Sequence, residues 1–268
     1  MKLKVLTDNY TYIDQYYLGE PGLSIYIEAE GKKFLLDTGY SDVFLRNAAK
    51  MQINLKALDG IIFSHGHNDH TAGLPYLLAE EGLPKQKIIA HPLCFAPKRA
   101  DGLDIGSPLS REKLASCCML NLSGSPIHLT EHLVFLGQIP RIVPFENNVI
   151  GETLVDGKWV PDSVLDDTAL VWQGKDGIFI ITGCSHSGIC NIVEQAIKVC
   201  GDEPIIGIIG GMHLFAVDDK LEQTINYLQS KHVTKLYPCH CVSLMAKAQM
   251  INAMPVATVG VNFSKEVE

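Results

Sequence analysis

Ile61-Ile62-Phe63-Ser64-His65-Gly66-His67-Asn68-Asp69-His70 is the stretch that decides how the rest of the sequence is interpreted. Its apolar start is typical of a buried strand, and Gly66 lets the flanking imidazoles converge on one ion. Burying so many polar groups without a metal would be costly. Imidazole and carboxylate ligands favour Zn²⁺, with Fe²⁺ or Mn²⁺ as alternatives. We therefore expect four metal ligands: His65, His67, Asp69 and His70.

This spacing, His-x-His-x-Asp-His, resembles the ligand motif of the metallo-β-lactamase superfamily. Leu35-Leu36-Asp37-Thr38-Gly39 resembles the family's first motif, whose Asp supports the site from behind a ligand. For Asp37, a turn-forming role is the alternative. The resemblance implies an α/β fold, an αββα sandwich of two mixed β-sheets flanked by helices. It also implies metal-dependent hydrolysis.

The predicted elements lead to the same architecture. Early hairpins and late strand-helix-strand units favour two sheets flanked by helices. Apolar segments predict strands at 3–7, 23–29, 33–37, 60–64, 87–91, 133–136, 169–173, 177–182, 204–210 and 235–238. Helices are expected at 43–51, 71–81, 188–200 and 221–231. We treat residues 1–268 as one domain with an insertion or lid at about 92–166, which is punctuated by Pro, Gly and Ser and has a helical piece near 111–119.

Two further predicted strands are followed by residues of types that commonly bind metals. The first is followed by Thr182-Gly183-Cys184-Ser185-His186, in which His186 is an expected ligand. Many members of the superfamily carry a bridging Asp where Cys184 stands, so Cys184 is either a ligand or a close neighbour, and the number of ions is open. In Tyr237-Pro238-Cys239-His240-Cys241, the resemblance makes His240 a ligand of a second metal. A Cys-His-Cys zinc knuckle is the competing interpretation.

The remaining histidines carry weaker signals. His213 follows an apolar strand and two glycines, which makes it a candidate for contact with substrate or metal; a structural role is the alternative. For His91 we favour the structural role. Ordinary roles are expected for His128, His132 and His232. As catalytic residues we predict Asp69, which would orient a water or pass on its proton, and His213, which would stabilise negative charge.

A narrower resemblance covers nearly the whole chain. The segments 183–186, 210–214 and Gly137-Gln138-Ile139-Pro140-Arg141 are similar to one branch of the superfamily, the 7,8-dihydropterin-6-methyl-4-(β-D-ribofuranosyl)aminobenzene-5′-phosphate synthase-like metal-dependent hydrolases. This implies a pocket for a pterin or another phosphorylated or acidic small molecule. Arg141 is the predicted substrate-binding cation. Lys98 and Arg99 are further candidates, with solvated surface charges as the alternative.

Composition restricts the partners. The net charge is −8 and no Lys/Arg cluster could follow a phosphate backbone, so we expect a small-molecule substrate rather than a nucleic acid. Neither a signal peptide nor an apolar span of membrane length is apparent, which predicts a cytoplasmic protein without a membrane partner. Oligomeric state is not predicted. Inert thiols are expected at Cys94, Cys117, Cys118, Cys190 and Cys200.

Three functions follow from these features. The first is hydrolysis by metal-activated water, with one or two divalent ions, zinc foremost. The second is a metal-site condensation on a pterin diphosphate, which the branch resemblance implies. The third is a catalytically silent protein that keeps the metal and binds a ligand. A di-iron redox role is disfavoured, because no part of the chain is left to form a flavin domain.

Overall fold

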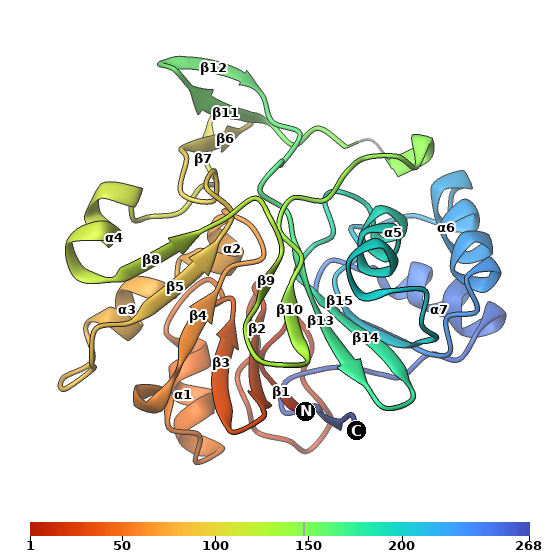
Figure 1. Ribbon diagram of the computed structural model, residues 1–268, viewed down its shortest axis with the longest axis horizontal. Helices are drawn as coiled ribbons and strands as arrows, with labels where there is room; N and C mark the ends of the chain where they lie inside the picture. The colour runs from red at the N-terminus through yellow and green to blue at the C-terminus, as the bar shows by residue number, and fades with distance from the viewer. Residues whose placement is uncertain (147) are drawn as a thin grey trace.

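Strand β14 (Gly177–Thr182) shows why the core is layered. All six of its residues are buried. Ile178 and Ile180 pack among helical residues, whereas Phe179 and Ile181 pack against a second sheet. Because successive side chains on a strand point to opposite faces, a strand that is apolar throughout needs cover on both sides. The computed structural model, which describes residues 1–146 and 148–268, provides that cover with two facing sheets and two outer layers of helices (Figure 1).

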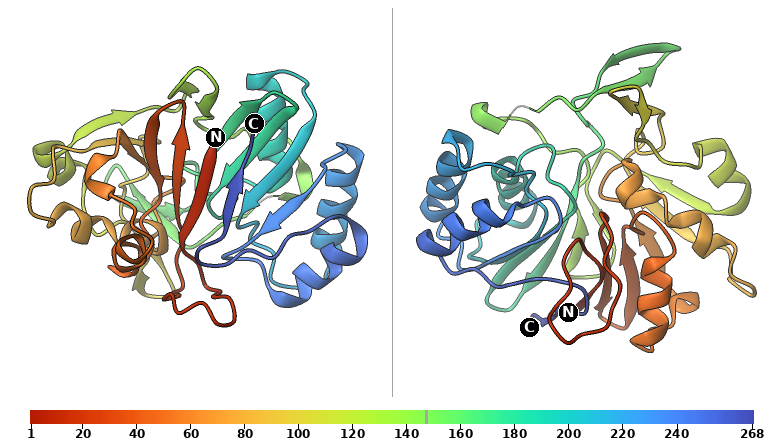
Figure 2. Two further views of the ribbon diagram at one scale, coloured as in Figure 1. Left: turned by 90° about the horizontal axis from the view of Figure 1, so that it is seen from below. Right: turned by 180° about the vertical axis from the view of Figure 1, so that it is seen from behind.

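The first sheet has seven strands and combines both pairing directions. Its strands run antiparallel at one side and parallel from β3 to β8. Their order is β17 (Ser264–Glu266), β1 (Lys2–Thr7), β2 (Ser24–Ala29), β3 (Lys32–Leu36), β4 (Gly60–Ile62), β5 (Lys87–Ala90) and β8 (Met119–Leu122). Pairing of β17 with β1 brings the two termini side by side (Figure 2).

The second sheet has six strands and is also mixed. Strands β14, β15 and β16 are parallel, and β13 joins them antiparallel. The order is β16 (Leu236–Pro238), β15 (Ile205–Gly210), β14, β13 (Ala169–Gly174), β10 (Leu133–Phe135) and β9 (Ile127–His128). The ten strands expected from the sequence are all present, with ends displaced by no more than two residues.

Helices cover the outer face of each sheet (Figures 1 and 2). The first sheet is flanked by α1 (Val43–Lys50), the 3-10 turn η1 (Leu55–Ala57), α2 (Asn68–Thr71), α3 (Leu74–Leu78) and α4 (Arg111–Cys117). The second is flanked by α5 (Ile189–Cys200), α6 (Asp219–Ser230) and α7 (Leu244–Ala253), with η2 (Pro144–Glu146) against α5 and α6. The predicted αββα sandwich is therefore confirmed.

Two helix predictions need correction. The helix expected at 71–81 is shortened to α3, and the separate helix α2 ends at Thr71, with Gly73 between the two. A Cβ at Gly73 would lie 2.0 Å from the carbonyl oxygen of Thr38, so the backbone approaches that loop closely. Helix α7 was missed. It buries only Ala246 and Met250, so its sequence lacks a broad apolar stripe.

The interval 92–166, expected as a single insertion, contributes both to the two main sheets and to a separate small sheet. Strand β8 extends the first sheet, and β9 and β10 extend the second. Only the rest forms a separate four-stranded sheet, which lies at the top of Figure 1 in the order β12 (Lys158–Pro161), β11 (Glu152–Val155), β6 (Lys98–Ala100) and β7 (Leu103–Asp104). Part of the predicted lid is thus core, because its short strands complete the two main sheets.

None of the helices in the described part of the chain has the length and apolar content needed to cross a lipid bilayer.

Candidate metal centre

The ends of five strands bring the predicted site residues together at one edge of the sandwich. Strands β3 and β4 are parallel neighbours, as are β14, β15 and β16, so within each set the carboxyl ends lie at the same edge. The loops beyond these ends carry Asp37, His65, His67, Asp69, His70, Cys184, His186, His213 and His240. Residues 170 positions apart, such as His70 and His240, are therefore neighbours in one site.

His65, His67 and His186 form one cluster, which we call the three-histidine site. His67 Nδ1 lies 3.1 Å from both His65 Nε2 and His186 Nε2. A single N–H on His67 could not serve both neighbours, whereas one cation can accept a lone pair from all three rings. Nitrogen atoms bound to one tetrahedral Zn²⁺ lie about 3.3 Å apart, which fits this spacing.

The electrostatics of the three-histidine site favour neutral rings. Burial lowers the pKa of His65 and of His186 well below the usual value. It also lowers the pKa of His67 to about 4. Neutral imidazole is the form that binds metal, so these rings are ready to bind an ion without first losing protons at neutral pH.

Asp69, His70, Cys184 and His240 form a second cluster, which we call the mixed site. His70 Nε2 lies 3.2 Å from both Cys184 Sγ and His240 Nε2. Asp69 Oδ2 lies 3.2 Å from His240 Nε2 and 3.7 Å from His70 Nε2. The four potential ligand atoms all lie within 4.8 Å of one another, so this donor set also fits a metal ion.

Hydrogen bonds fix the far side of three imidazoles. His70 Nδ1 lies 2.7 Å from Asp37 Oδ2, and His65 Nδ1 lies 3.0 Å from Ser64 Oγ. His240 Nδ1 lies 2.9 Å from Asn9 Oδ1. Such contacts orient a metal-binding ring and select its tautomer. Asp37 thus lies behind His70, where the sequence placed it, and is no member of either ligand cluster among the described residues.

His70 differs electrostatically from the three-histidine rings. Burial alone would lower its pKa, but the carboxylates of Asp69 and Asp37 outweigh burial and raise the pKa of His70 to about 9. Two negative charges beside one buried imidazole attract a positive charge to this position, which a proton or a metal ion can supply.

The loop between β12 and β13 carries Asp162, Asp166 and Asp167, and we call it the acidic loop. It supports the segments that carry the ligands of the three-histidine site. Asp166 Oδ2 accepts a hydrogen bond of 2.7 Å from the backbone N–H of Gly66, and Asp167 accepts one of 2.9 Å from that of Ser187. Each of these amides is adjacent to a ligand of the three-histidine site. Gly66 itself is required by close approach, because a Cβ there would lie 1.8 Å from the carbonyl oxygen of Cys94. The loop therefore fixes the backbone on both sides of that site.

Three cations considered for substrate binding, namely the predicted Arg141 and the further candidates Lys98 and Arg99, are engaged within the protein. Lys98 is buried, with its ammonium 2.7 Å from Asp162 and 2.8 Å from Asp166, so it neutralises the acidic loop instead of a phosphate. Arg99 pairs with Glu152 and lies over the ring of Trp159.

Arg141 lies beside the site, but its guanidinium is directed at the backbone. It donates to the carbonyl oxygens of His186, Ser163 and Val164. These bonds tie the His186 loop to the acidic loop. Substrate binding by Arg141 stays a prediction. The contacts in the structure give the side chain a supporting role, because three of its five N–H groups already meet carbonyl groups.

His213 lies next to the three-histidine site without joining either ligand cluster among the described residues. Its ring lies 4.6 Å from that of His186 and 4.7 Å from that of Phe215, measured between centroids. His91 lies elsewhere, 3.4 Å from Gln138 Oε1. All eight cysteines are free thiols.

Both clusters open into one cavity of about 450 Å³. Ligands of the two sites form its floor, including His67, Asp69 and His240. Ile105, directly after β7, and Ile150, shortly before β11, also line the cavity, so the small sheet lies beside it. No Lys or Arg lines this cavity among the described residues. An anion in this cavity would therefore not meet a Lys or Arg side chain of its lining.

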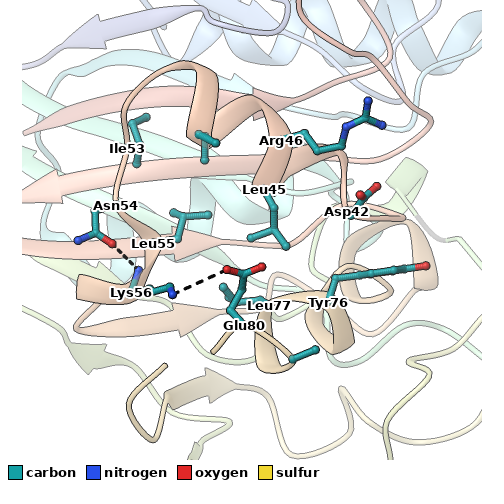
Figure 3. Close-up of a pocket in the computed structure, with 13 residues that line it drawn as sticks. Asp42, Leu45, Arg46, Ile53, Asn54, Leu55, Lys56, Tyr76, Leu77 and Glu80 are labelled. Carbon is teal, nitrogen blue, oxygen red and sulfur yellow. Dashed lines mark hydrogen bonds and ion pairs between the residues drawn. The ribbon is translucent and has the colours of Figure 1, made fainter. Parts of the chain in front are cut away.

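A larger groove between α1, η1 and α3 is unrelated to this centre (Figure 3). It has a volume of about 580 Å³ and an apolar floor that includes Leu45 and Leu77. An ion pair between Lys56 and Glu80 lies at its side. None of the predicted ligands lines it, so we assign the chemistry to the smaller cavity.

The supporting residues of the site escaped the sequence analysis. Asn9 lies 231 positions from His240, and Asp166 lies 100 positions from the Gly66 amide that it binds. One signal was present: the pair Asp166-Asp167 directly precedes a buried strand, as the ligand segments directly follow theirs. Asn9 carried no such signal.

Comparisons with known proteins agree with this geometry. Residues 18–185 match the metallo-beta-lactamase superfamily. An uncharacterised protein of Methanocaldococcus jannaschii is 33% identical over 262 residues, covering 96% of this chain and 98% of the relative. The 7,8-dihydropterin-6-methyl-4-(beta-D-ribofuranosyl)-aminobenzene-5'-phosphate synthase of the same organism is 32% identical over 265 residues, covering 92% and 89%.

Solved structures give the same result. A metal-dependent hydrolase of the beta-lactamase superfamily superposes with a TM-score of 0.87 and 26% identity, covering 100% of this chain and 99% of the other. The short form of human tRNase Z shares the fold alone, with a TM-score of 0.54 and 14% identity over the full length of both chains. Since the family match spans more than half of the sequence and includes the ligand motif, the chain belongs to the metallo-beta-lactamase superfamily.

Proposed function

We propose that the protein is a metal-dependent hydrolase that acts on a phosphorylated or acidic small molecule through metal-activated water. The observation that carries this proposal is the pair of buried ligand clusters at the floor of one cavity. Zinc is the expected metal, because imidazole and thiol ligands suit it better than they suit harder ions. A divalent ion held by these ligands would lower the pKa of a coordinated water and polarise a carbonyl or phosphoryl oxygen.

Asp69 is the side chain we assign to the attacking water. It lines the cavity, and its side chain is 32% exposed, whereas those of His70 and His240 are 0% and 4% exposed. Burial opposes ionisation, but His70 and His240 outweigh it and hold the pKa of Asp69 well below its usual range. Asp69 is therefore a carboxylate at neutral pH, suited to accepting a hydrogen bond from water and orienting it.

His213 is the residue we assign to the substrate side of the reaction. It lines the same cavity, and its contacts with His186 and Phe215 hold the ring in place. A fixed imidazole at this position can donate a hydrogen bond to an oxygen on which negative charge develops.

The test is a substrate panel with protein loaded separately with Zn²⁺, Mn²⁺ and Fe²⁺. Phosphate esters, lactones, thioesters and pterin derivatives cover the expected classes. We expect hydrolysis of a phosphorylated or acidic compound that is lost on chelation and in the His65→Ala variant. Binding of panel members without turnover of any would contradict the proposal and favour the ligand-binding alternative.

Condensation is the second candidate, and the synthase relative at 32% identity is the observation that favours it. The same ligand clusters would then serve to stabilise a leaving diphosphate rather than to activate water. Product analysis separates the two reactions, since a synthase joins two substrates and releases diphosphate, whereas a hydrolase incorporates oxygen from ¹⁸O-labelled water into its product.

The proposed setting is the cytoplasm, with a small molecule as the substrate and neither nucleic acid nor membrane as a partner. Eight free thiols, one of them in the mixed site, suit a reducing compartment. Cell fractionation tests this part, and recovery in an oxidising compartment would contradict it.

A further inference from the structure

A second cavity adjoins the metal centre on the side of α7. Its volume is about 570 Å³, within the range of small-molecule sites. It shares Asn9, Phe215 and His240 with the cavity over the metal ligands, so the two spaces border on the same residues. We call it the Lys247 cavity. A molecule that reacts at the metal centre can therefore extend into it.

The walls of the Lys247 cavity are mainly apolar and partly aromatic. Val242 and Val259 are buried in its lining, whereas Phe215, Tyr10 and Ile251 are 59%, 45% and 60% exposed. Large apolar side chains that are exposed together around a cavity are typical of a ligand-binding surface. Two aromatic rings at one entrance favour a flat ring as the occupant.

Lys247 supplies a charge in these surroundings. Its ammonium makes no ion pair or hydrogen bond with any residue that the structure describes. Asp8 lines the same cavity, but its carboxylate oxygens accept hydrogen bonds from the backbone N–H groups of His240 and Tyr10. Lys247 attracts the Asp8 carboxylate without forming an ion pair with it, so the hydrogen-bonding positions of the ammonium stay open to an anionic group on a ligand.

A third cavity, on the opposite side of the metal centre, gives a useful contrast. It shares Tyr40 and Asn68 with the cavity over the metal ligands and is larger than that cavity, at about 750 Å³. Its cation, Lys98, is paired with two aspartates. Of the three cavities, only the Lys247 cavity combines apolar walls with an unpaired cation among the described residues.

From this arrangement we infer that the Lys247 cavity is a substrate subsite for an aryl or heteroaryl group with an anionic substituent. The inference rests on the proposed hydrolase function, because the reacting ester would lie over the metal ligands. The ring would lie between Phe215 and Tyr10, and its anionic substituent would meet Lys247. Asn9 and His240 lie where the two parts of the substrate join.

Two esters that differ in one charge test the inference. Phenyl phosphate and 4-carboxyphenyl phosphate are compared as substrates of the metal-loaded protein. We expect kcat/KM to be about tenfold higher for the carboxylated ester, the scale of one charged hydrogen bond. The preference should fall to near one in Lys247→Met and persist in Lys198→Met, which removes the same charge from an exposed position on α5.

A second variant and a binding measurement keep the result independent of catalysis. Ile251→Trp, at an exposed position of the lining, should fill the cavity and reduce the same preference. Titration calorimetry with 4-hydroxybenzoate, the expected product, should show binding to the wild type and to Lys198→Met that is at least tenfold weaker in Lys247→Met. Circular dichroism checks that each variant is folded.

The outcomes separate the two proposals. Binding of 4-hydroxybenzoate that depends on Lys247, without hydrolysis of any compound of the panel, would support the subsite and contradict the hydrolase function. Hydrolysis of both esters with the same preference in all variants would support the hydrolase and overturn the subsite.

Discussion

The two ligand clusters differ in charge, although members of both line the same cavity. The three-histidine site contains only imidazoles, whose pKa values burial lowers. The mixed site contains a carboxylate and a thiol, with Asp37 directly behind one of its rings. Neutral ligands leave the charge of a divalent ion intact, whereas anionic ligands cancel part of it. The first site is therefore suited to polarising a substrate, and the second to retaining its ion.

The clusters also differ in how they are held. Asp166 and Asp167 hold the three-histidine site through backbone N–H groups next to the ligands. The mixed site has a carboxylate or amide partner on two of its rings, Asp37 on His70 and Asn9 on His240, whereas among the described residues only the Ser64 hydroxyl meets a ring of the three-histidine site. Changes to the acidic loop should therefore alter stability first, and changes to the ring partners should alter metal affinity first.

Removing one ligand from each cluster should have the largest effect. We expect His65→Ala and His70→Ala each to lose metal and to reduce activity at least about 1,000-fold, the scale of losing an essential catalytic group. Metal analysis and kinetics measure this, and circular dichroism should show the α/β fold retained. His128→Ala, at an exposed position, should keep both metal and activity. Full metal content in both ligand variants would refute the site assignment.

Replacing the thiol should sharpen the difference between the clusters. In Cys184→Ser we expect the mixed site to lose more than the roughly 10- to 100-fold in zinc affinity that loss of a supporting residue costs. Cobalt-loaded wild type should show a thiolate-to-metal charge-transfer band that the variant lacks. Cys117→Ser, an exposed control, should retain the band. An unchanged spectrum in Cys184→Ser would exclude Cys184 as a ligand.

A smaller effect is expected from the partners of the rings. Asp37→Asn should lower metal affinity of the mixed site by about 10- to 100-fold, because His70 loses a carboxylate that orients it and raises its basicity. Asn9→Ala should have a weaker effect, since a neutral amide is lost from His240. Competition with a chelator measures both. A larger loss in Asn9→Ala than in Asp37→Asn would contradict this order.

The smallest effect concerns stability and pH. Burial raises the pKa of Asp167 to about 6, so the folded protein binds this proton more tightly than the unfolded chain does. The stability that this group contributes is present below pH 4 and is lost as pH rises from about 4 to about 6, by up to about 3 kcal/mol. Denaturant unfolding of the metal-free wild type and Asp167→Asn should show a difference that changes over this range. A difference constant with pH would contradict it.

The sequence alone predicted the fold because its signals are local. Short apolar runs such as 177–182 favour buried strands, and the His65–His70 segment indicates the superfamily by its spacing. Strand ends also predicted the positions of His186 and His240. These inferences needed only residue type and short spacing, which hydrophobic burial and ligand chemistry translate directly into structure.

Tertiary structure decided the pairing of the ligands and the roles of the cations. No spacing reveals that His186 lies with His65 and His67 while Cys184, two residues away, lies with His70 and His240. Lys98 and Arg141 were candidates for substrate binding from the sequence. In the fold, Lys98 contacts carboxylates and Arg141 contacts backbone carbonyls, all from distant segments. A charge is free or engaged only according to what the packed chain places beside it, and that depends on contacts far apart in sequence.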